Sequence, residues 1–373
     1  MATGRIPGTS GSPLTAKGDI FAYSTTASRL PVGADGTTLV ANSAATTGLA
    51  WTGNQAAGKN GVINGNLDYW QRGTSFSGTA NAYTADRMYC QYGTATISRQ
   101  TTGAPNGSQY VIRAAGTSAS SYTTIAQILE TSTTSTFWGQ TVTFSFKARR
   151  NSSFATSLTV NIDKTSTVDG AFVGPTWTNI STTTVSNANL PTGTGSSNWY
   201  TTTLTAAIPN DGTANTIRVV IYGTAAFASG DYYELSQLQL ELGSSPTTFT
   251  RAGGTLQGEL AACQRYYVRF LPDDTGLYGN IGTGMGYNAT QTRIFVTCPV
   301  QLRTGSKTLD YANCSIYDGT NASISVTSFT IATAGTKLVF VNANTAAGGV
   351  QYRPYLLEID NNANGYFGIS AEL

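Results

Sequence analysis

The sequence contains no histidine among its 373 residues. Histidine is the commonest general base of enzymes and the commonest metal ligand. Serine–histidine and cysteine–histidine catalysis are therefore excluded.

Charge is also scarce, because charged residues make up 11% of the chain and the net charge is +2. A nucleic-acid-binding face needs many side chains that neutralise phosphates. The only tight basic cluster is Lys147, Arg149 and Arg150, and a short charge run of this kind is usually solvated. The composition predicts no nucleic-acid partner.

Long apolar runs are missing as well. No run approaches the length of a membrane-spanning helix, and the N-terminus lacks the apolar core of a signal peptide. The four cysteines show no paired spacing of the metal or redox kind, so we expect buried free thiols: Cys90, Cys263, Cys298 and Cys314. We expect no membrane insertion, and assembly in a reducing cytoplasm with release by a route other than Sec-type export.

What the chain does contain favours strands. It has 41 Gly and 20 Tyr, and Thr, Ser, Asn and Ala supply much of the remainder. Few Lys, Glu and Leu leave little material for amphipathic helices. Thr, Val, Ile and Tyr between Gly, Asn and Ser suit short strands joined by tight turns. The composition predicts an all-β fold.

Residues 1–61 have apolar residues only in ones and twos between Gly and Asp turns. One copy of such a segment cannot bury a core or cover its own backbone. Three copies wound about one axis can supply strand edges to one another. We predict an N-terminal attachment arm and an intertwined, trimeric β stem; the alternative is a disordered linker.

Residues 62–250 are predicted to form one jelly-roll-like β-sandwich. Its runs alternate polar and apolar residues and are bounded by Gly, Asn or Ser. The clearest runs are 140–148, 157–163, 216–222 and 233–242. Short strands repeated in this way are typical of sandwiches.

Residues 251–373 are predicted to form a separate C-terminal tip domain, a β-sandwich knob. It opens with the one helical pattern of the chain, 255–267, which leads into a strand at 267–270. Further alternating runs lie at 292–296, 323–331 and 337–341, and a last strand runs from 365 to the terminus. A terminus tied into a sheet is ordered, which suits a compact knob.

Three stretches resemble tail-fibre and minor tail proteins of tailed bacteriophages. The first combines Leu14-Thr-Ala-Lys-Gly-Asp-Ile-Phe with Arg29-Leu-Pro-Val-Gly-Ala-Asp-Gly and Gly48-Leu-Ala-Trp51. The second, Asn64-Gly-Asn-Leu-Asp-Tyr-Trp-Gln-Arg-Gly-Thr-Ser-Phe76 with Tyr83-Thr-Ala-Asp-Arg87, is similar to the opening of a phage sandwich domain shaped like carbohydrate-binding modules. The third joins Gln239-Leu-Glu-Leu-Gly243 and Phe249 to Cys263-Gln-Arg-Tyr-Tyr267.

These stretches are spread over about the first two-thirds of the chain, in the family's order. The resemblance implies a homotrimeric structural protein on the virion surface that adheres to host surface polysaccharide. Its arm would be held by a capsid, tail or baseplate protein. The sequence leaves one alternative open, a capsid-attached head fibre or decoration protein. The arm is too short to be a large tail-docking domain, so attachment to the capsid stays an alternative.

Exposed aromatic residues are the candidates for glycan contacts. The Ser- and Gly-rich loop that ends in Asn198, Trp199 and Tyr200 offers one candidate site. In the C-terminal domain the candidates are Tyr278, Tyr287, Tyr317 and Tyr352, of which Tyr287 and Tyr317 are preferred, with trimer contact as the alternative role. Exposed loop aromatics are common binding residues.

Trp70, Gln71 and Arg72 have two interpretations. An aromatic face flanked by an amide and a guanidinium suits sugar stacking. The favoured interpretation is structural: Trp70 fills the sandwich core, and Arg72 pairs with a buried carboxylate such as Asp86. Gln264 and Arg265 belong to the junction motif that the resemblance places between sandwich and tip.

Asp68 and Glu234 lie near the two ends of the predicted sandwich. In carbohydrate-binding modules of similar shape, carboxylates of the first and last strands often hold a structural calcium ion. The resemblance therefore makes these two residues candidate calcium ligands, although calcium takes six or more oxygens. No other cofactor is expected.

An enzyme that cleaves capsular polysaccharide is the rival of another class. It needs two carboxylates roughly 5–10 Å apart across a cleft. The close acidic pairs of the C-terminal domain are Asp273 with Asp274, in turn-forming sequence, and Glu358 with Asp360. No repeat of the kind that builds a long β-helix is visible, so we expect no enzymatic activity.

Overall fold

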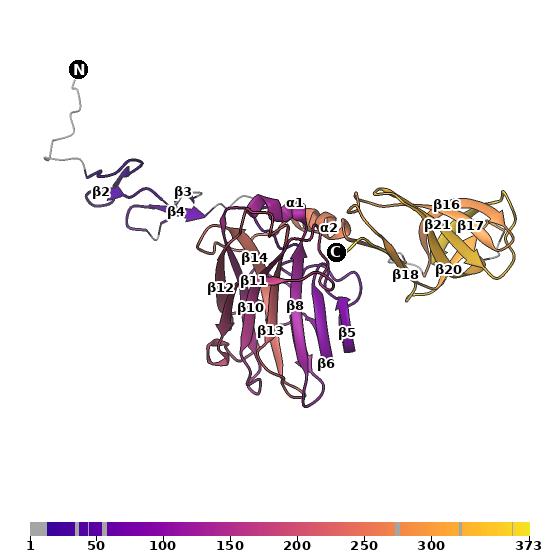
Figure 1. Cartoon of the computed structure of the whole chain (residues 1–373), viewed down its shortest axis with the longest axis horizontal. Helices are drawn as coiled ribbons and strands as arrows, with labels where there is room; N and C mark the ends of the chain where they lie inside the picture. Colours follow the sequence, from indigo (N-terminus) through magenta and orange to yellow (C-terminus); the bar gives the residue numbers. More distant parts are fainter. Residues whose placement is uncertain are drawn as a thin grey trace, which may run out of the picture.

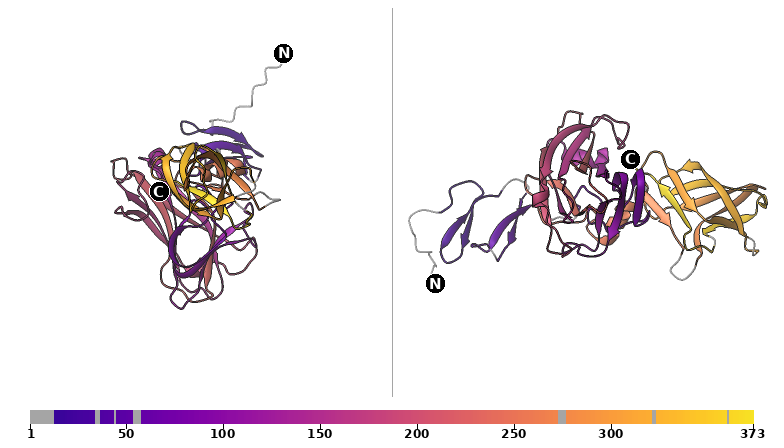
Figure 2. Two further views of the ribbon diagram at one scale, coloured as in Figure 1. Left: turned by 90° about the vertical axis from the view of Figure 1, so that its right-hand side faces the viewer. Right: turned by 90° about the horizontal axis from the view of Figure 1, so that it is seen from below.

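The computed structural model describes residues 13–33, 37–43, 45–53, 58–272, 277–320, 323–359 and 361–373. They form three parts in line: small N-terminal hairpins, a large sandwich and a C-terminal barrel (Figure 1). The view from below shows the same linear order (Figure 2). The predicted all-β fold is confirmed.

The N-terminal part consists of two separate hairpins. Strand β1 (Ile20–Tyr23) pairs with β2 (Ala27–Leu30), and β3 (Thr37–Ala41) pairs with β4 (Leu49–Gly53). The Asp19 carboxylate closes the first hairpin, since it accepts hydrogen bonds from Arg29 Nε at 2.7 Å and from the Ala16 amide at 2.7 Å. An isolated two-stranded hairpin is at best marginally stable in water.

The middle part is one antiparallel sheet folded into a sandwich. Its order is β11-β10-β13-β8-β6-β7-β14-β9-β12, with β5 paired to β6. The strands are β5 (Ser75–Tyr83), β6 (Tyr89–Gln100), β7 (Val111–Gly116), β8 (Tyr122–Leu129), β9 (Thr141–Arg150), β10 (Leu158–Thr165), β11 (Thr178–Val185), β12 (Tyr200–Ala207), β13 (Thr216–Gly223) and β14 (Tyr232–Leu242).

Strand β6 passes from one layer of the sandwich to the other. Its first half, Tyr89–Gly93, pairs with β8, and its second half, Ala95–Gln100, pairs with β7. Thr94 lies between the halves with a φ of 47°. This left-handed backbone bends the strand and lets a single sheet cover both sides of one core.

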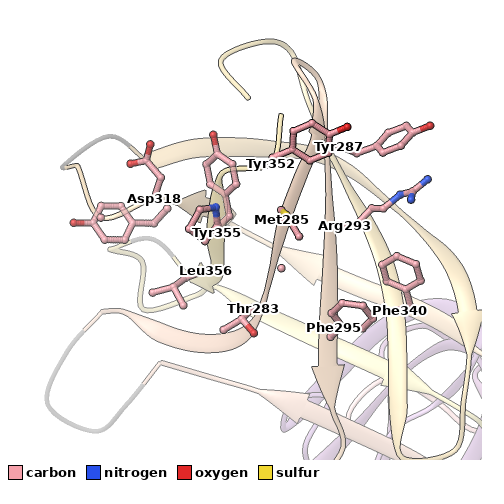
Figure 3. A pocket seen from close by; sticks show the side chains of 15 residues that line it. Thr283, Met285, Tyr287, Arg293, Phe295, Asp318, Phe340, Tyr352, Tyr355 and Leu356 are labelled. Atoms are coloured by element: carbon pink, nitrogen blue, oxygen red, sulfur yellow. The ribbon is translucent and has the colours of Figure 1, made fainter. Parts of the chain in front are cut away.

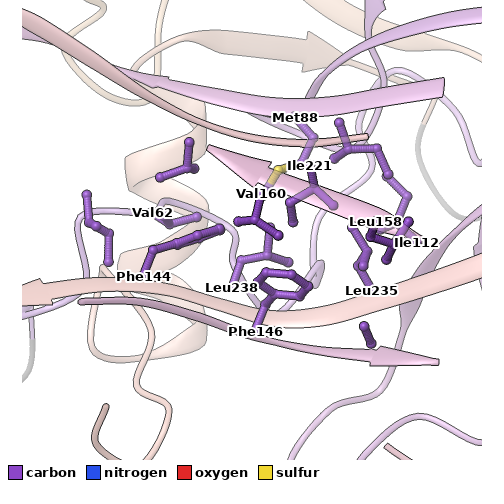
Figure 4. Close-up of a cluster of buried hydrophobic side chains, with 14 of the residues drawn as sticks. Val62, Met88, Ile112, Phe144, Phe146, Leu158, Val160, Ile221, Leu235 and Leu238 are labelled. Carbon is purple, nitrogen blue, oxygen red and sulfur yellow. The ribbon is translucent and has the colours of Figure 1, made fainter. Parts of the chain in front are cut away.

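The core of the sandwich comes from alternating strand residues, as the sequence predicts. Strand β10 buries every second residue over most of its length. Side chains from both layers meet in the interior (Figure 4), among them Ile112, Phe144, Phe146, Leu158, Val160, Ile221 and Leu235, all at most 1% exposed. Burying each such side chain contributes about 1.5–3 kcal/mol.

Short helical segments lie in the connections between strands of the sandwich. These are α1 (Thr131–Thr134), η1 (Ser135–Phe137) and η2 (Asn187–Asn189). The predicted helix near 255–267 is present as α2 (Leu256–Gln264). Its N-cap is Thr255, whose hydroxyl accepts a hydrogen bond from the Gly258 amide at 3.0 Å, the usual way to satisfy a free helix donor.

The C-terminal part contains a three-stranded sheet, β15-β23-β18, and a closed barrel, β16-β17-β21-β20-β19-β22. Its strands are β15 (Tyr267–Phe270), β16 (Gly279–Asn288), β17 (Gln291–Thr297), β18 (Thr308–Ala312), β19 (Cys314–Tyr317), β20 (Ser323–Ala334), β21 (Leu338–Thr345), β22 (Pro354–Ile359) and β23 (Tyr366–Ser370).

The expected sandwich shape of the knob is therefore refined to a barrel. Strand β22 pairs with β19 on one side and with β16 on the other. These two pairings close the sheet on itself, and closure removes the exposed strand edges that an open sheet keeps.

Contacts with the sandwich begin before the boundary that we expected at residue 61. The Asn60 side chain donates to the carbonyls of Leu238 and Thr250, both at 3.0 Å. Lys59 forms a buried ion pair with Glu241 at 3.3 Å. The segment from residue 58 onward thus contacts the sandwich, while the hairpins precede it (Figure 1).

Candidate functional site

The outer wall of the barrel carries a pocket of about 760 Å³, which we call the barrel pocket (Figure 3). Strands β16, β17, β21 and β22 form it together with the turns after β19 and before β22. Its lining residues are Thr283, Gly284, Met285, Gly286, Tyr287, Arg293, Phe295, Tyr317, Asp318, Gly319, Phe340, Tyr352, Pro354, Tyr355 and Leu356.

The strand register brings these side chains together. Thr283 lies opposite Leu356 on one side and Phe295 on the other, and Phe295 lies opposite Phe340. The Phe295 and Phe340 rings stack with centroids 4.8 Å apart and planes 13° from parallel. Directly opposed residues share one face of a sheet, so this row forms a strip across four strands that is apolar except for the Thr283 hydroxyl.

Alternation explains why the strip faces outward. In β17, Ile294 and Val296 are fully buried in the barrel, whereas Phe295 between them is 48% exposed. Met285 in β16 is likewise 51% exposed. Large apolar side chains on the outer wall of a barrel leave an exposed apolar patch, and such patches mark interaction sites.

Glycines shape the floor of the barrel pocket. A Cβ on Gly284 would lie 1.8 Å from the carbonyl oxygen of Arg293, and one on Gly286 would lie 2.1 Å from that of Val350. Neither contact is sterically possible. Only glycine allows β16 to come this close to its neighbours and hollow the wall under Met285 and Tyr287.

Tyr352 is the most prominent aromatic residue at the barrel pocket. Its side chain is 74% exposed, and its backbone has a φ of 63°. Its amide donates to the Gly286 carbonyl at 2.8 Å, and the Gly286 amide donates to the Arg353 carbonyl at 2.8 Å. A bulky residue rarely adopts this backbone region unless its surroundings hold it there, as they often do at functional sites.

Two polar groups lie on opposite sides of the pocket (Figure 3). Asp318 accepts hydrogen bonds from Thr320 Oγ1 at 2.5 Å and from Arg353 Nη1 at 2.6 Å. The Thr320 hydroxyl and amide, followed by Arg353, hold the pKa of Asp318 below its usual value. Opposite it, the Arg293 guanidinium lies 3.7 Å from the centre of the Tyr287 ring.

The structure brings three of the four candidate tyrosines of the C-terminal domain, Tyr287, Tyr317 and Tyr352, to the same pocket. The fourth, Tyr278, is 51% exposed but does not line it. Phe295, Phe340 and Arg293 were not singled out from the sequence. A signal existed, because a strand at 292–296 that buries its Ile and Val must turn Arg293 and Phe295 the other way. That β21 and β22 lie beside them could not be read from this pattern.

The other predicted glycan-binding residues lie on the sandwich, away from the barrel. The Trp199 indole donates to the Gly103 carbonyl at 3.1 Å, and the Arg149 guanidinium covers one face of its ring at 4.3 Å. Tyr200 is 38% exposed and Asn198 is exposed. The indole is therefore held in structural contacts, and Tyr200 and Asn198 remain the accessible part of that loop.

Trp70 has the structural role that we favoured. It is 7% exposed, and its indole donates to the Leu67 carbonyl at 2.8 Å. The predicted pairing of Arg72 with Asp86 is wrong. Asp86 instead accepts from the Gln71 amide at 2.9 Å and from the Gln71 side chain at 2.5 Å.

Arg72 pairs with Glu372, next to the end of the chain, at 3.3 Å, and covers the Tyr267 ring at 3.6 Å. Asp86 was the expected partner of Arg72 because the two residues are close in sequence. The last residues of the chain return to the sandwich, however, and bring Glu372 to Arg72. Arg265 also joins the two domains, since its Nη2 lies 3.0 Å from Glu130. Gln264 is the last residue of α2 and is half-buried.

The predicted calcium ligands are engaged by arginines. Asp68 pairs with Arg251 at 2.7 Å. Glu234 is buried between Arg113, at 2.6 Å, and Arg149. Among the residues that the structure describes, no three His, Cys, Asp or Glu residues gather in a possible metal site. Guanidinium groups therefore already neutralise both carboxylates, which does not favour calcium binding by either of them.

Of the two acidic pairs considered for catalysis, the structure describes only Glu358. Asp273, Asp274 and Asp360 lie outside the described residues. Glu358 is buried, and its carboxylate accepts a hydrogen bond from the Ser323 hydroxyl at 3.3 Å. The only carboxylate lining the barrel pocket, within the part of the chain described, is Asp318.

All four cysteines are free and buried, as predicted. Burial raises the pKa of Cys90 and of Cys314 to about 12. In the described ranges, no helix is both long enough and apolar enough to cross a membrane.

Comparisons with known proteins find no family model and no curated protein that matches this chain. Among solved structures, it is similar to a putative sugar binding protein from Bacteroides thetaiotaomicron, with 11% identity and a TM-score of 0.32. That match covers 49% of this chain and all of the other.

Two further structures are similar over about half of this chain. The CBM22-1 xylan-binding domain of Paenibacillus barcinonensis Xyn10C has 10% identity and a TM-score of 0.32, over 52% of this chain and all of that domain. The enzymatically active domain of bacteriophage CBA120 tailspike protein 4 has 11% identity and a TM-score of 0.31, over 49% of this chain and 21% of that one. Values this low carry no functional conclusion.

Proposed function

We propose that this protein is a non-enzymatic, homotrimeric fibre on the surface of a bacteriophage virion that adheres to host surface glycans through the barrel pocket. The observation that carries the proposal is the position and chemistry of this pocket. It lies in the domain farthest from the N-terminal hairpins (Figure 1) and combines exposed aromatic faces with a few polar groups.

The lining suits a sugar. A pyranose ring has an apolar face that stacks on aromatic rings and hydroxyl groups that need hydrogen-bond partners. Tyr287, Tyr317 and Tyr352 offer rings and phenol groups, and Phe295 and Phe340 extend the apolar floor. Binding pockets typically join apolar walls to a few polar groups that fix orientation.

The same lining supports a binding role in preference to glycan cleavage. Glycoside hydrolysis by the usual route requires a pair of carboxylates, one of them protonated as the acid. Asp318 is the one carboxylate in the described lining, and its lowered pKa keeps it ionised and paired with Arg353.

Weak single sites are sufficient for adhesion when several act together. Linked sites raise the overall strength of binding by roughly 10²–10⁴ when they reach the host at the same time. A trimer carries three barrel pockets, and a particle carries many fibres.

The hairpins support trimerisation through the stem. Tyr23 is 69% exposed and Phe21 is 51% exposed, although both belong to a two-stranded sheet too small to be stable alone. Neighbouring copies of the same segment would cover these side chains and supply the missing strand partners.

Light scattering tests the trimer. The full-length chain is expected to have the mass of three chains, and a chain that begins at residue 58 should fall toward one. This truncation retains Lys59 and Asn60, which contact the sandwich. A monomeric full-length protein would refute the trimer, and a trimeric truncation would move the interface to the sandwich or barrel.

The arm would attach the fibre to a tail, a baseplate or a capsid protein. Attachment to the capsid, as a head fibre, is the alternative form of the same proposal. The copy number per particle separates them, because capsid decoration follows capsid symmetry and tail fibres follow the lower symmetry of the tail.

Glycan binding is tested on a glycan array with the full-length protein and a Tyr352→Ala variant. Removal of one stacking ring is expected to weaken binding about tenfold, since aromatic contacts contribute roughly 0.5–1.5 kcal/mol beyond their buried area. Tyr122→Ala is the matched control, because Tyr122 is a 54% exposed tyrosine on the sandwich. Equal losses in both variants, or no bound glycan, would contradict the proposal.

A further inference from the structure

The barrel pocket contains an arginine, Arg293, that no carboxylate of the described residues neutralises. Arg293 is exposed, and its guanidinium forms no ion pair or hydrogen bond with any residue that the structure describes. The other arginine beside the pocket, Arg353, is paired with Asp318 at 2.6 Å. One lining arginine is thus free, and the one lining carboxylate is already neutralised.

Contacts with neighbouring residues fix the position of the Arg293 side chain. The guanidinium lies 3.7 Å from the centre of the Tyr287 ring. Across the strands, Arg293 is opposite Met285 on one side and Asn342 on the other. A ring that holds one face of a guanidinium leaves its N–H groups directed outward along the edge.

The charge around the pocket favours an anion. The charges of Asp318 and its partner Arg353 cancel, and Asp318 lies on the side of the pocket opposite Arg293 (Figure 3). Arg293 therefore contributes a net positive charge to the pocket, and the one carboxylate of the described lining, Asp318, is already paired. The planar N–H pair of arginine matches the two oxygens of a carboxylate.

We propose that the barrel pocket selects glycans that carry a carboxylated sugar, whose carboxylate pairs with Arg293 while its ring stacks on the neighbouring aromatics. This inference rests on the proposed function and specifies the ligand of the same pocket. A neutral sugar would leave the guanidinium unused, whereas a uronic or sialic acid uses both the charged group and the apolar strip.

The test is an array that displays uronic-acid and sialic-acid glycans beside neutral glycans, followed by titration with the bound glycan and its carboxyl-reduced form. The strongest signals are expected on carboxylated glycans. Arg293→Gln should weaken their binding about 10- to 100-fold, the usual effect of losing hydrogen bonds to a charged group, and Arg293→Lys should restore only part of it.

Arg99→Gln is the matched control, since Arg99 also lies over a tyrosine, Tyr110, at 4.5 Å, but on the sandwich. It should bind like the wild type. Preference for neutral glycans, equal affinity for the carboxyl-reduced form, or an unchanged Arg293→Gln variant would overturn the inference and leave glycan binding standing. Absence of binding to every glycan would overturn both.

Discussion

Arg87, in the sandwich, forms an ion pair with Glu372, the second-last residue of the chain. Arg87 is 1% exposed, and its Nη2 also donates to the Ile128 carbonyl at 2.7 Å. Its guanidinium covers the Tyr266 ring at 3.5 Å. These contacts of Arg87 with Glu372 and Tyr266 hold the C-terminal domain against the sandwich.

Glu372→Gln is expected to destabilise this junction strongly. The variant keeps the side-chain shape but leaves Arg87 and Arg72 charged in a buried position. Removal of one partner of a buried ion pair typically costs about 3–5 kcal/mol, and scanning calorimetry measures the change. Asp211→Asn, in an exposed loop, is the control and should shift stability by less than about 0.5 kcal/mol. Equal melting of the two variants would contradict the role of Glu372.

Asp86 should make stability fall as pH rises. Burial raises its pKa to about 6, against about 3.9 in an unfolded chain. Between these values the native state holds a proton that the unfolded state has lost, so stability declines from about pH 4 to about pH 6, by roughly 3 kcal/mol from this residue.

Urea unfolding from pH 4 to pH 8 tests this effect with Asp86→Asn. In the variant, the free energy of unfolding is expected to lack the fall that Asp86 causes between pH 4 and pH 6. An amide placed against Gln71 lowers stability by the same amount at every pH and does not produce such a fall. Nearby Arg72 and Glu372 are present in both proteins, so the difference between the two curves isolates Asp86. Parallel curves would exclude a raised pKa at this site.

Gly284→Ala should damage the barrel pocket. The added Cβ would lie 1.8 Å from the Arg293 carbonyl oxygen, so β17 must move and carry Arg293 with it. Overpacking of this kind costs about 1–3 kcal/mol, and we expect weaker glycan binding with a lower melting temperature. Gly195→Ala, whose Cβ would meet its nearest atom at 3.6 Å, should change neither. A fully active Gly284→Ala variant would disprove the need for glycine.

The cysteines should resist alkylation in the native protein. Cys90 is fully buried, and burial raises its pKa to about 12, so very little thiolate exists at pH 8. Mass spectrometry after iodoacetamide treatment should show no labelling without denaturant and four labels in its presence. Rapid native labelling of Cys90 would contradict the buried thiol.

Local pattern was sufficient to predict most elements. The alternating runs at 140–148, 216–222 and 233–242 are strands β9, β13 and β14, and the helical pattern after Thr255 is α2. Such patterns depend on which side chains fall on one face, and this follows from periods of two and 3.6 residues. The burial of Trp70 followed from its size.

The partners of side chains were decided only by the tertiary structure. Arg72 meets Glu372, 300 positions away, because β23 returns the C-terminus to the sandwich, and no local pattern reports this.

The amino-acid sequence by itself determined the all-β class, the absence of histidine chemistry and which residues of each strand face outward. Strand order, barrel closure and register brought Arg293, Phe295, Phe340 and Tyr352 to one pocket. Pairing between distant strands depends on the packing of the whole domain rather than on local preference, and this is the physical reason why only the folded chain reveals the site.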